Sequence, residues 1–98
     1  MTTRYLVLAN FTDQGIRTVK DTTKRAALVS EMGKSAGVNM KSIFWTLGGF
    51  DLVIEVEAPD DATMTAWGLT VGAMGNVRTQ TLRAFDAKEM DGILAKMK

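Results

Sequence analysis

The sequence contains neither cysteine nor histidine among its 98 residues. Serine–histidine and cysteine–histidine catalysis are therefore excluded, because both need histidine as the general base. Disulfides, haem held by a proximal histidine, and the usual zinc and iron–sulfur ligands are excluded as well. Asp60 and Asp61 stand at an expected helix start and lack the further oxygen ligands that a metal ion needs. We predict no metal site and no cofactor.

Glu55 is the carboxylate best placed for a chemical role, because it lies in the middle of the apolar run of residues 52–58. In a cavity it could act as a general base, and beside an arginine it would form an ion pair. Its expected partner is Arg78, Arg83 or an arginine of a second chain. We favour an ion pair at a subunit interface, since structural ion pairs produce the same environment as catalytic ones.

The segment Gly48-Gly49-Phe50-Asp51 separates two apolar runs. Its residue types are those that a hairpin turn requires: glycines reach positive φ, and aspartate accepts hydrogen bonds from nearby backbone amides. Alternatively, Asp51 stands at the mouth of a cavity. We favour the turn.

Two further groups of polar residues have a structural and a functional interpretation. Arg78 to Thr81 is typical of an exposed edge strand, where charge discourages aggregation, and could instead bind a polar or anionic ligand. The basic residues between Arg17 and Arg25 indicate a solvated helix face. The indole of Trp45 is expected in the core or a cavity wall.

These residues need elements to position them. Residues 5–9 predict a buried strand, and residues 12–36 predict helix that ends at Gly37. Gly15 and the polar residues 21–23 indicate a bend or a division into two helical segments. The four-residue spacing of Leu28, Met32 and Ala36 places these three side chains against a sheet.

A β-hairpin is predicted from residues 40–47 and 52–58. If residues 48–51 form the loop, Leu47 pairs with Leu52. The next pairs on the same face are Trp45 with Ile54, and Ile43 with Val56.

The second half predicts a helix that Asp60 caps, a polar strand at residues 77–85 and a terminal helix over residues 86–97. Asp86 and Glu89 form its capping box. The apolar residues expected to face the sheet from the first of these helices are Met64, Trp67, Val71 and Met74. Those of the terminal helix are Met90, Ile93, Leu94 and Met97.

This order predicts an α+β fold: a ferredoxin-like βαββαβ unit plus a C-terminal helix, with a four-stranded antiparallel sheet. The first and third strands are expected in the centre, with the helices on one face. The other face is expected to carry a mixture of Tyr5, Val7, Phe44, Thr46, Val53 and Glu55. That face is too apolar to be left in water, so we predict a homodimer or larger homo-oligomer.

Size and charge narrow the class of protein. We expect residues 1–98 to form a single domain, and the net charge of +1 argues against nucleic acid as a partner. RNA binding is disfavoured further, because aliphatic residues and an acid replace the aromatics that stack on bases. Without a signal-peptide pattern or a run of about 20 apolar residues, we predict a cytoplasmic protein without membrane contact.

Three segments resemble the GYD domain family, which is named for a Gly-Tyr-Asp motif. They are residues 45–53, 76–82 and 11–16. The resemblance implies a dimeric α/β barrel, in a family whose biochemical function is uncharacterised. Phe50 replaces the tyrosine of the motif, so it supplies no hydroxyl for acid catalysis or hydrogen bonding.

The function we predict from these features is the binding of a small-molecule ligand in an apolar cavity at the barrel. Its candidate residues are Trp45, Phe50, Asp51, Glu55 and Arg78. The alternatives are a structural or interaction module that binds no ligand, and a cofactor-free enzyme resembling the monooxygenases of related barrels.

Overall fold

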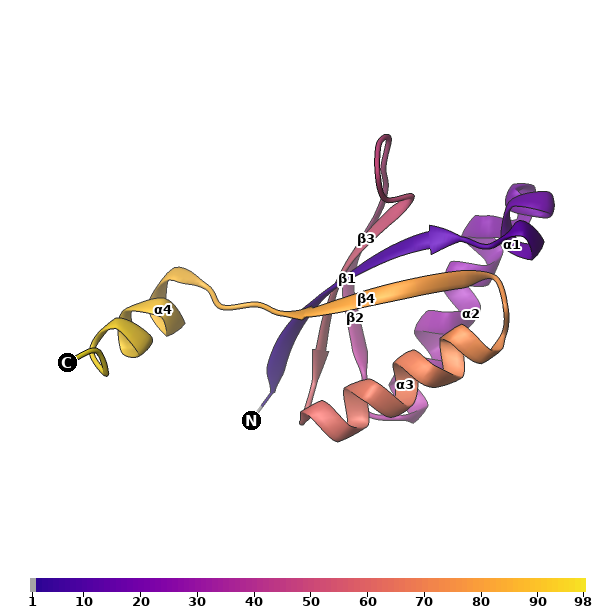
Figure 1. Cartoon of the computed structure of the whole chain (residues 1–98). Coiled ribbons are helices and arrows are strands. Elements are labelled where there is room, and N and C mark those ends of the chain that lie inside the picture. The colour runs from indigo at the N-terminus through magenta and orange to yellow at the C-terminus, as the bar shows by residue number, and fades with distance from the viewer. Residues whose placement is uncertain (1) are drawn as a thin grey trace.

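The computed structural model describes residues 2–98. Within this range, four strands and four α-helices follow one another (Figure 1). The first half contains β1 (Thr3–Phe11), α1 (Asp13–Arg17), a 3₁₀ turn (Val19–Asp21), α2 (Thr22–Ser35) and β2 (Asn39–Trp45). The second half contains β3 (Leu52–Ala58), α3 (Asp61–Ala73), β4 (Val77–Arg83) and α4 (Ala87–Leu94).

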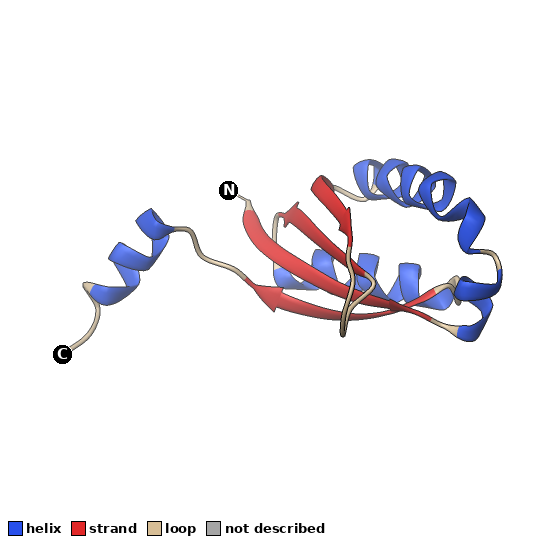
Figure 2. Ribbon diagram, turned by 90° about the horizontal axis from the view of Figure 1, so that it is seen from above, coloured by secondary structure: helices blue, strands red, loops and turns tan. Residues whose placement is uncertain are grey.

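The strands form one antiparallel sheet in the order β2-β3-β1-β4. The α+β, ferredoxin-like prediction is therefore confirmed, with the first and third strands in the centre. Helices α2 and α3 cover one face of this sheet, whereas α4 stands apart from it in both views (Figure 1 and Figure 2).

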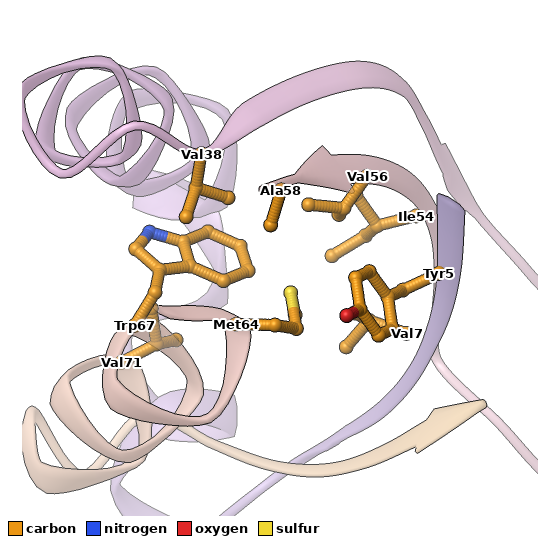
Figure 3. Packing of buried hydrophobic residues seen from close by; sticks show 9 residues of the cluster. All are labelled: Tyr5, Val7, Val38, Ile54, Val56, Ala58, Met64, Trp67 and Val71. Atoms are coloured by element: carbon orange, nitrogen blue, oxygen red, sulfur yellow. The ribbon is translucent and has the colours of Figure 1, made fainter. Parts of the chain in front are cut away.

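The hydrophobic core lies between the sheet and the two helices (Figure 3). Met64, Trp67 and Val71 of α3 point toward the sheet as the sequence predicts, and each is less than a tenth exposed. Met74, expected on the same stripe, is 38% exposed. The sheet contributes Tyr5, Val7, Ile54, Val56 and Ala58, and the loop before β2 contributes Val38.

Local signals predicted the helix ends well. Asp60 accepts a hydrogen bond from the backbone of Thr63, and Asp86 and Glu89 form a complete capping box. Gly37 has a φ of 81°, a conformation that glycine adopts without a steric cost. The bend in the first helical region is also confirmed, as a 3₁₀ turn between α1 and α2.

The predicted hairpin register is wrong by two residues. Leu52 pairs with Trp45 rather than with Leu47, and Ile54 pairs with Ile43. The loop is longer than expected, because the Thr46 N–H donates to the carbonyl of Asp51 at 2.8 Å and leaves Leu47 in solvent. A shift of two residues preserves the face, so Trp45 and Ile43 still lie on the side of Leu52 and Ile54.

The predicted helix stripe in α2 is also wrong. Leu28 is 62% exposed and Ala36 is exposed, whereas Val29 packs against the core and Gly33 is buried. Gly33 determines which side of α2 faces the core, because a Cβ there would lie 2.8 Å from the carbonyl oxygen of Val38. The helix turns its smallest residue toward this close contact.

Tyr5 and Val7 were expected among the residues of the uncovered face, and they lie in the core instead. Tyr5 pairs with Val56 and Val7 with Ile54, so alternation sends Leu6 and Leu8 to the other side. The last strand is shorter than predicted and ends at Arg83.

Candidate functional site

Asp51 closes the hairpin loop, which projects beyond the sheet (Figure 1). One carboxylate oxygen, Oδ2, accepts a hydrogen bond from the backbone N–H of Phe11 at 2.9 Å. The backbone N–H of Asp51 donates to the carbonyl of Ala9, also at 2.9 Å. Asp51 thereby joins the loop to the end of β1, as the turn interpretation requires.

Among the other loop and edge candidates, Trp45 and Arg78 lie on opposite edge strands of the sheet. Trp45 is 41% exposed, and its indole N–H donates to the hydroxyl of Thr22 at 3.0 Å. Phe50 is half-buried in the loop, where its carbonyl accepts from Thr46. Arg78 is exposed at the start of β4, opposite Asn10 of β1.

Glu55 lies on the sheet face that α2 and α3 leave uncovered. Its two carboxylate oxygens are 3.3 Å from Nε of Arg4 and 3.1 Å from the hydroxyl of Ser42. Within the chain, its partner is therefore Arg4, not the predicted Arg78 or Arg83. The sequence did indicate that Arg4 lies on this face, because Arg4, Leu6 and Leu8 are spaced two residues apart along one strand and therefore share a face.

Arg4 also connects the sheet to α4. Its guanidinium lies 2.7 Å from Oε1 of Glu89 and 3.6 Å from Oδ2 of Asp86. The hydrogen bond to Glu89 raises the pKa of Arg4, and the backbone N–H of Glu89 lowers the pKa of the Asp86 carboxyl. These charges fix the start of α4 beside the uncovered sheet face.

The uncovered sheet face carries apolar side chains from every strand. We call it the open face and define its apolar part as Leu6, Leu8, Phe44, Val53 and Leu82. Phe44 is 62% exposed and Leu82 is 39% exposed. The apolar residues of α4, which are Met90, Ile93 and Leu94, are also uncovered, and so is Met97, which follows the helix.

On the opposite side, the space between sheet and helices is apolar and small. It measures about 70 Å³ and is lined by side chains such as Val7, Ile54, Val29, Met64 and Trp67. None of the five predicted ligand-binding residues lines it. The structure thus does not bring those residues together around one cavity, and their role in binding stays a prediction.

A second groove runs between α3 and β4, with a volume of about 440 Å³. At one end, the hydroxyl of Tyr5 donates to Oδ1 of Asp61 at 2.5 Å, and Nη1 of Arg83 lies 3.6 Å from the same oxygen. Burial raises the pKa of the Tyr5 phenol, and the bond to Asp61 raises it further. The sequence patterns did not indicate this groove, because it joins residues from three elements.

Residues 2–98 contain neither a cluster of metal ligands nor a helix that could span a membrane. Among residues 2–98, no three acidic side chains gather closely enough to hold a metal ion. No helix in this range combines the length and the apolar character that crossing a bilayer requires.

The sequence of this chain matches the model of a known protein family. The model of the GYD domain covers residues 5–94. This chain belongs to the GYD domain family. The predicted resemblance is confirmed, and this GYD domain has Phe50 in the central position of the motif.

A curated relative of this GYD domain comes from Thermus thermophilus. It is named "glutamine synthetase and cystathionine beta-lyase binding protein". The two sequences are 32% identical over 87 residues, which make up 88% of this chain and 92% of the relative. No solved structure matches this GYD domain significantly.

Proposed function

We propose that this GYD domain is a protein-interaction module that pairs with a second copy through its open face and binds a metabolic enzyme. The observation that carries the proposal is the open face itself, where apolar side chains of all four strands are uncovered together. Contiguous exposed apolar surface of this kind marks an interaction site.

A second copy suits the open face because the charges there are mixed. Glu55 and Glu57 lie beside Arg4 and Lys41 on the same sheet. Two copies related by a twofold axis can therefore face each other without opposing surfaces of one sign. The uncovered apolar side of α4, which Arg4 holds at the border of this face, would extend the contact.

Binding of a metabolic enzyme is supported by the name of the Thermus thermophilus relative. The match spans nearly all of both chains, so the two proteins share a common architecture along their length. We extend that kind of partner to this chain as part of the proposal.

We rank small-ligand binding and cofactor-free oxygenase chemistry second. Small-molecule sites usually measure about 300–1,000 Å³. The space of about 70 Å³ between sheet and helices falls below this range. The groove of about 440 Å³ between α3 and β4 falls within it, but none of the five predicted ligand-binding residues lines that groove. A hydroxyl at position 50 is also lacking, because the residue is phenylalanine.

The test uses glutamine synthetase and cystathionine beta-lyase, purified from the organism that encodes this chain. Each enzyme is passed over the immobilised domain, and binding is followed by biolayer interferometry. We expect saturable binding of at least one enzyme with a Kd below about 10 μM, which corresponds to roughly 7 kcal/mol. If neither enzyme binds, the enzyme-binding part of the proposal is overturned.

A further inference from the structure

We propose that the free edge of β4, together with the groove between β4 and α3, binds an extended acidic segment of the partner protein. The segment would add a fifth strand to the sheet. This inference rests on the proposed interaction function and names the way in which the partner is held.

The free edge offers unpaired backbone groups. Strand β4 lies at the end of the sheet, and within residues 2–98 it pairs with β1 alone. The Ala84 N–H donates to the carbonyl of Arg4, and the Thr12 N–H donates to the carbonyl of Asn76, each at 3.1 Å. In an antiparallel ladder, hydrogen-bonded pairs alternate with non-hydrogen-bonded pairs, so these two bonds fix the phase of the whole strand.

This hydrogen-bonding pattern determines whether the backbone N–H and C=O groups of each β4 residue point toward β1 or away from it. Arg78, Gln80 and Leu82 bond to β1, counting in steps of two from Asn76 and Ala84. The N–H and C=O groups of Thr79 and Thr81 therefore point away from the sheet. An extended peptide could pair with these groups, as in other proteins that bind peptides by strand addition.

The same residues line the groove with their side chains. Thr79, Thr81 and Arg83 face α3, where Thr65 and Leu69 form the opposite wall. Leu69 is 69% exposed, so an apolar side chain of the bound segment could cover it. A strand placed here would thus bond to the edge with its backbone and contact α3 with every second side chain.

The basic residues of the edge strand indicate what kind of segment binds there. Strand β4 contains Arg78 and Arg83 and no acid, and the other edge strand, β2, contains Lys41 and no acid. Pairing the β4 edges of two copies would bring their arginines close together, whereas a segment with glutamate or aspartate would meet opposite charge. Arg83 retains a partner at one end of the groove, because Asp61 lies 3.6 Å from its guanidinium.

The first experiment uses the unmodified domain and labelled peptides. The probe is a peptide of about nine residues that alternates glutamate with valine or threonine, a length that would span strand β4. Its control carries lysine in place of glutamate. Fluorescence anisotropy should show saturable binding of the acidic peptide below about 1 mM and binding at least about tenfold weaker for the lysine peptide.

Two further peptides test the strand geometry directly. One is N-methylated at its odd positions and the other at its even positions. Only alternate N–H groups of an added strand face the protein, so one of the two should bind at least about tenfold more weakly than the other. Equal binding of the two methylated peptides, or no saturable binding of the acidic peptide, overturns the inference.

A pair of variants links the edge to the partner enzyme. Thr81→Pro removes an N–H that points away from β1, whereas Thr81→Val keeps that N–H and the branched shape. Thr81→Pro should weaken binding of the enzyme at least about tenfold, and Thr81→Val should change it less.

The outcomes separate the two proposals. If the enzyme binds both variants as it binds the parent, the strand-addition inference fails and the proposed function stands. If no enzyme binds the parent, the enzyme-binding part of the proposed function fails. The peptide measurements use the parent domain, so they test strand addition even if Thr81→Pro does not fold.

Discussion

The carboxylate of Asp51 accepts a hydrogen bond from the backbone N–H of Phe11, with 2.9 Å between Oδ2 and N. These residues lie 40 positions apart in the sequence. The bond joins the turn of the β2–β3 hairpin to the end of the neighbouring central strand. The aspartate of the family motif therefore has a structural task in this chain that does not depend on the aromatic residue before it.

Replacing Asp51 should destabilise the domain. Asp51→Ala leaves the Phe11 N–H without its acceptor, so the free energy of unfolding should fall by about 1–3 kcal/mol. Asp51→Asn keeps an acceptor oxygen and should cost less. Urea unfolding measures both, with Phe50→Tyr as a neighbouring change expected to leave stability near that of the parent. An Asp51→Ala variant as stable as the parent would contradict the structural role.

The open face can be tested with two residues of equal exposure. Phe44 on the open face and Leu28 on the outer side of α2 are both 62% exposed. Phe44→Asp places a charge where a second copy would bury it, whereas Leu28→Asp places one in solvent. Light scattering after size exclusion should give a dimer for the parent and for Leu28→Asp, and a monomer for Phe44→Asp. A monomeric parent would rule out the homodimer.

Gly15 and Gly72 provide a second matched pair. A Cβ on Gly15 would lie 1.9 Å from the carbonyl oxygen of Asn76, whereas a Cβ on Gly72 meets nothing within 4 Å. Gly15→Ala should therefore lower the free energy of unfolding by about 1–3 kcal/mol, as overpacking does. Gly72→Ala should raise it by about 0.5 kcal/mol, since alanine favours the helix. Thermal unfolding distinguishes the two, and similar melting temperatures would show that the α1 contact with Asn76 is not tight.

Tyr5 should make stability sensitive to alkaline pH. Its pKa is raised in the folded state by burial and by the bond to Asp61, so the fold favours the neutral phenol. The resulting stability is fully present below the ordinary tyrosine pKa near 10 and is lost as the pH rises from there through the folded pKa. Since Tyr5 is the sole tyrosine, the ultraviolet absorbance of its phenolate reports this titration alone.

The control for this effect is Tyr5→Phe. It should lose about 1 kcal/mol at neutral pH with the hydrogen bond to Asp61. Its remaining stability should then fall less steeply than that of the parent above pH about 10. A Tyr5 phenol that titrates at its ordinary value would show that the hydroxyl is open to water.

Local sequence signals determined much of the fold. The caps at Asp60 and Asp86, the stop at Gly37 and the bend before α2 depend on residues within a few positions of one another. The polarity of each strand then indicated which two are central. Such features are readable from sequence because the interactions that produce them are short in range.

The errors came from elements whose local pattern was ambiguous. Residues 5–9 are apolar throughout, so alternation could not say whether Tyr5 or Leu6 faces the helices. In α2, two candidate stripes differ by one residue, and the close approach of Gly33 to Val38 selected Val29 over Leu28. These choices depend on packing partners that are distant in sequence.

By itself, the sequence determined the order of elements and excluded histidine and cysteine chemistry. The motif at residues 48–51 also indicated membership of the GYD domain family. The tertiary structure alone decided that Glu55 pairs with Arg4, that α4 stands apart from the sheet with its apolar side uncovered, and that β4 and α3 form a groove. The physical reason is the separation in sequence of the residues that interact. Turns and caps are formed by near neighbours, whereas surfaces arise where the fold brings distant segments together.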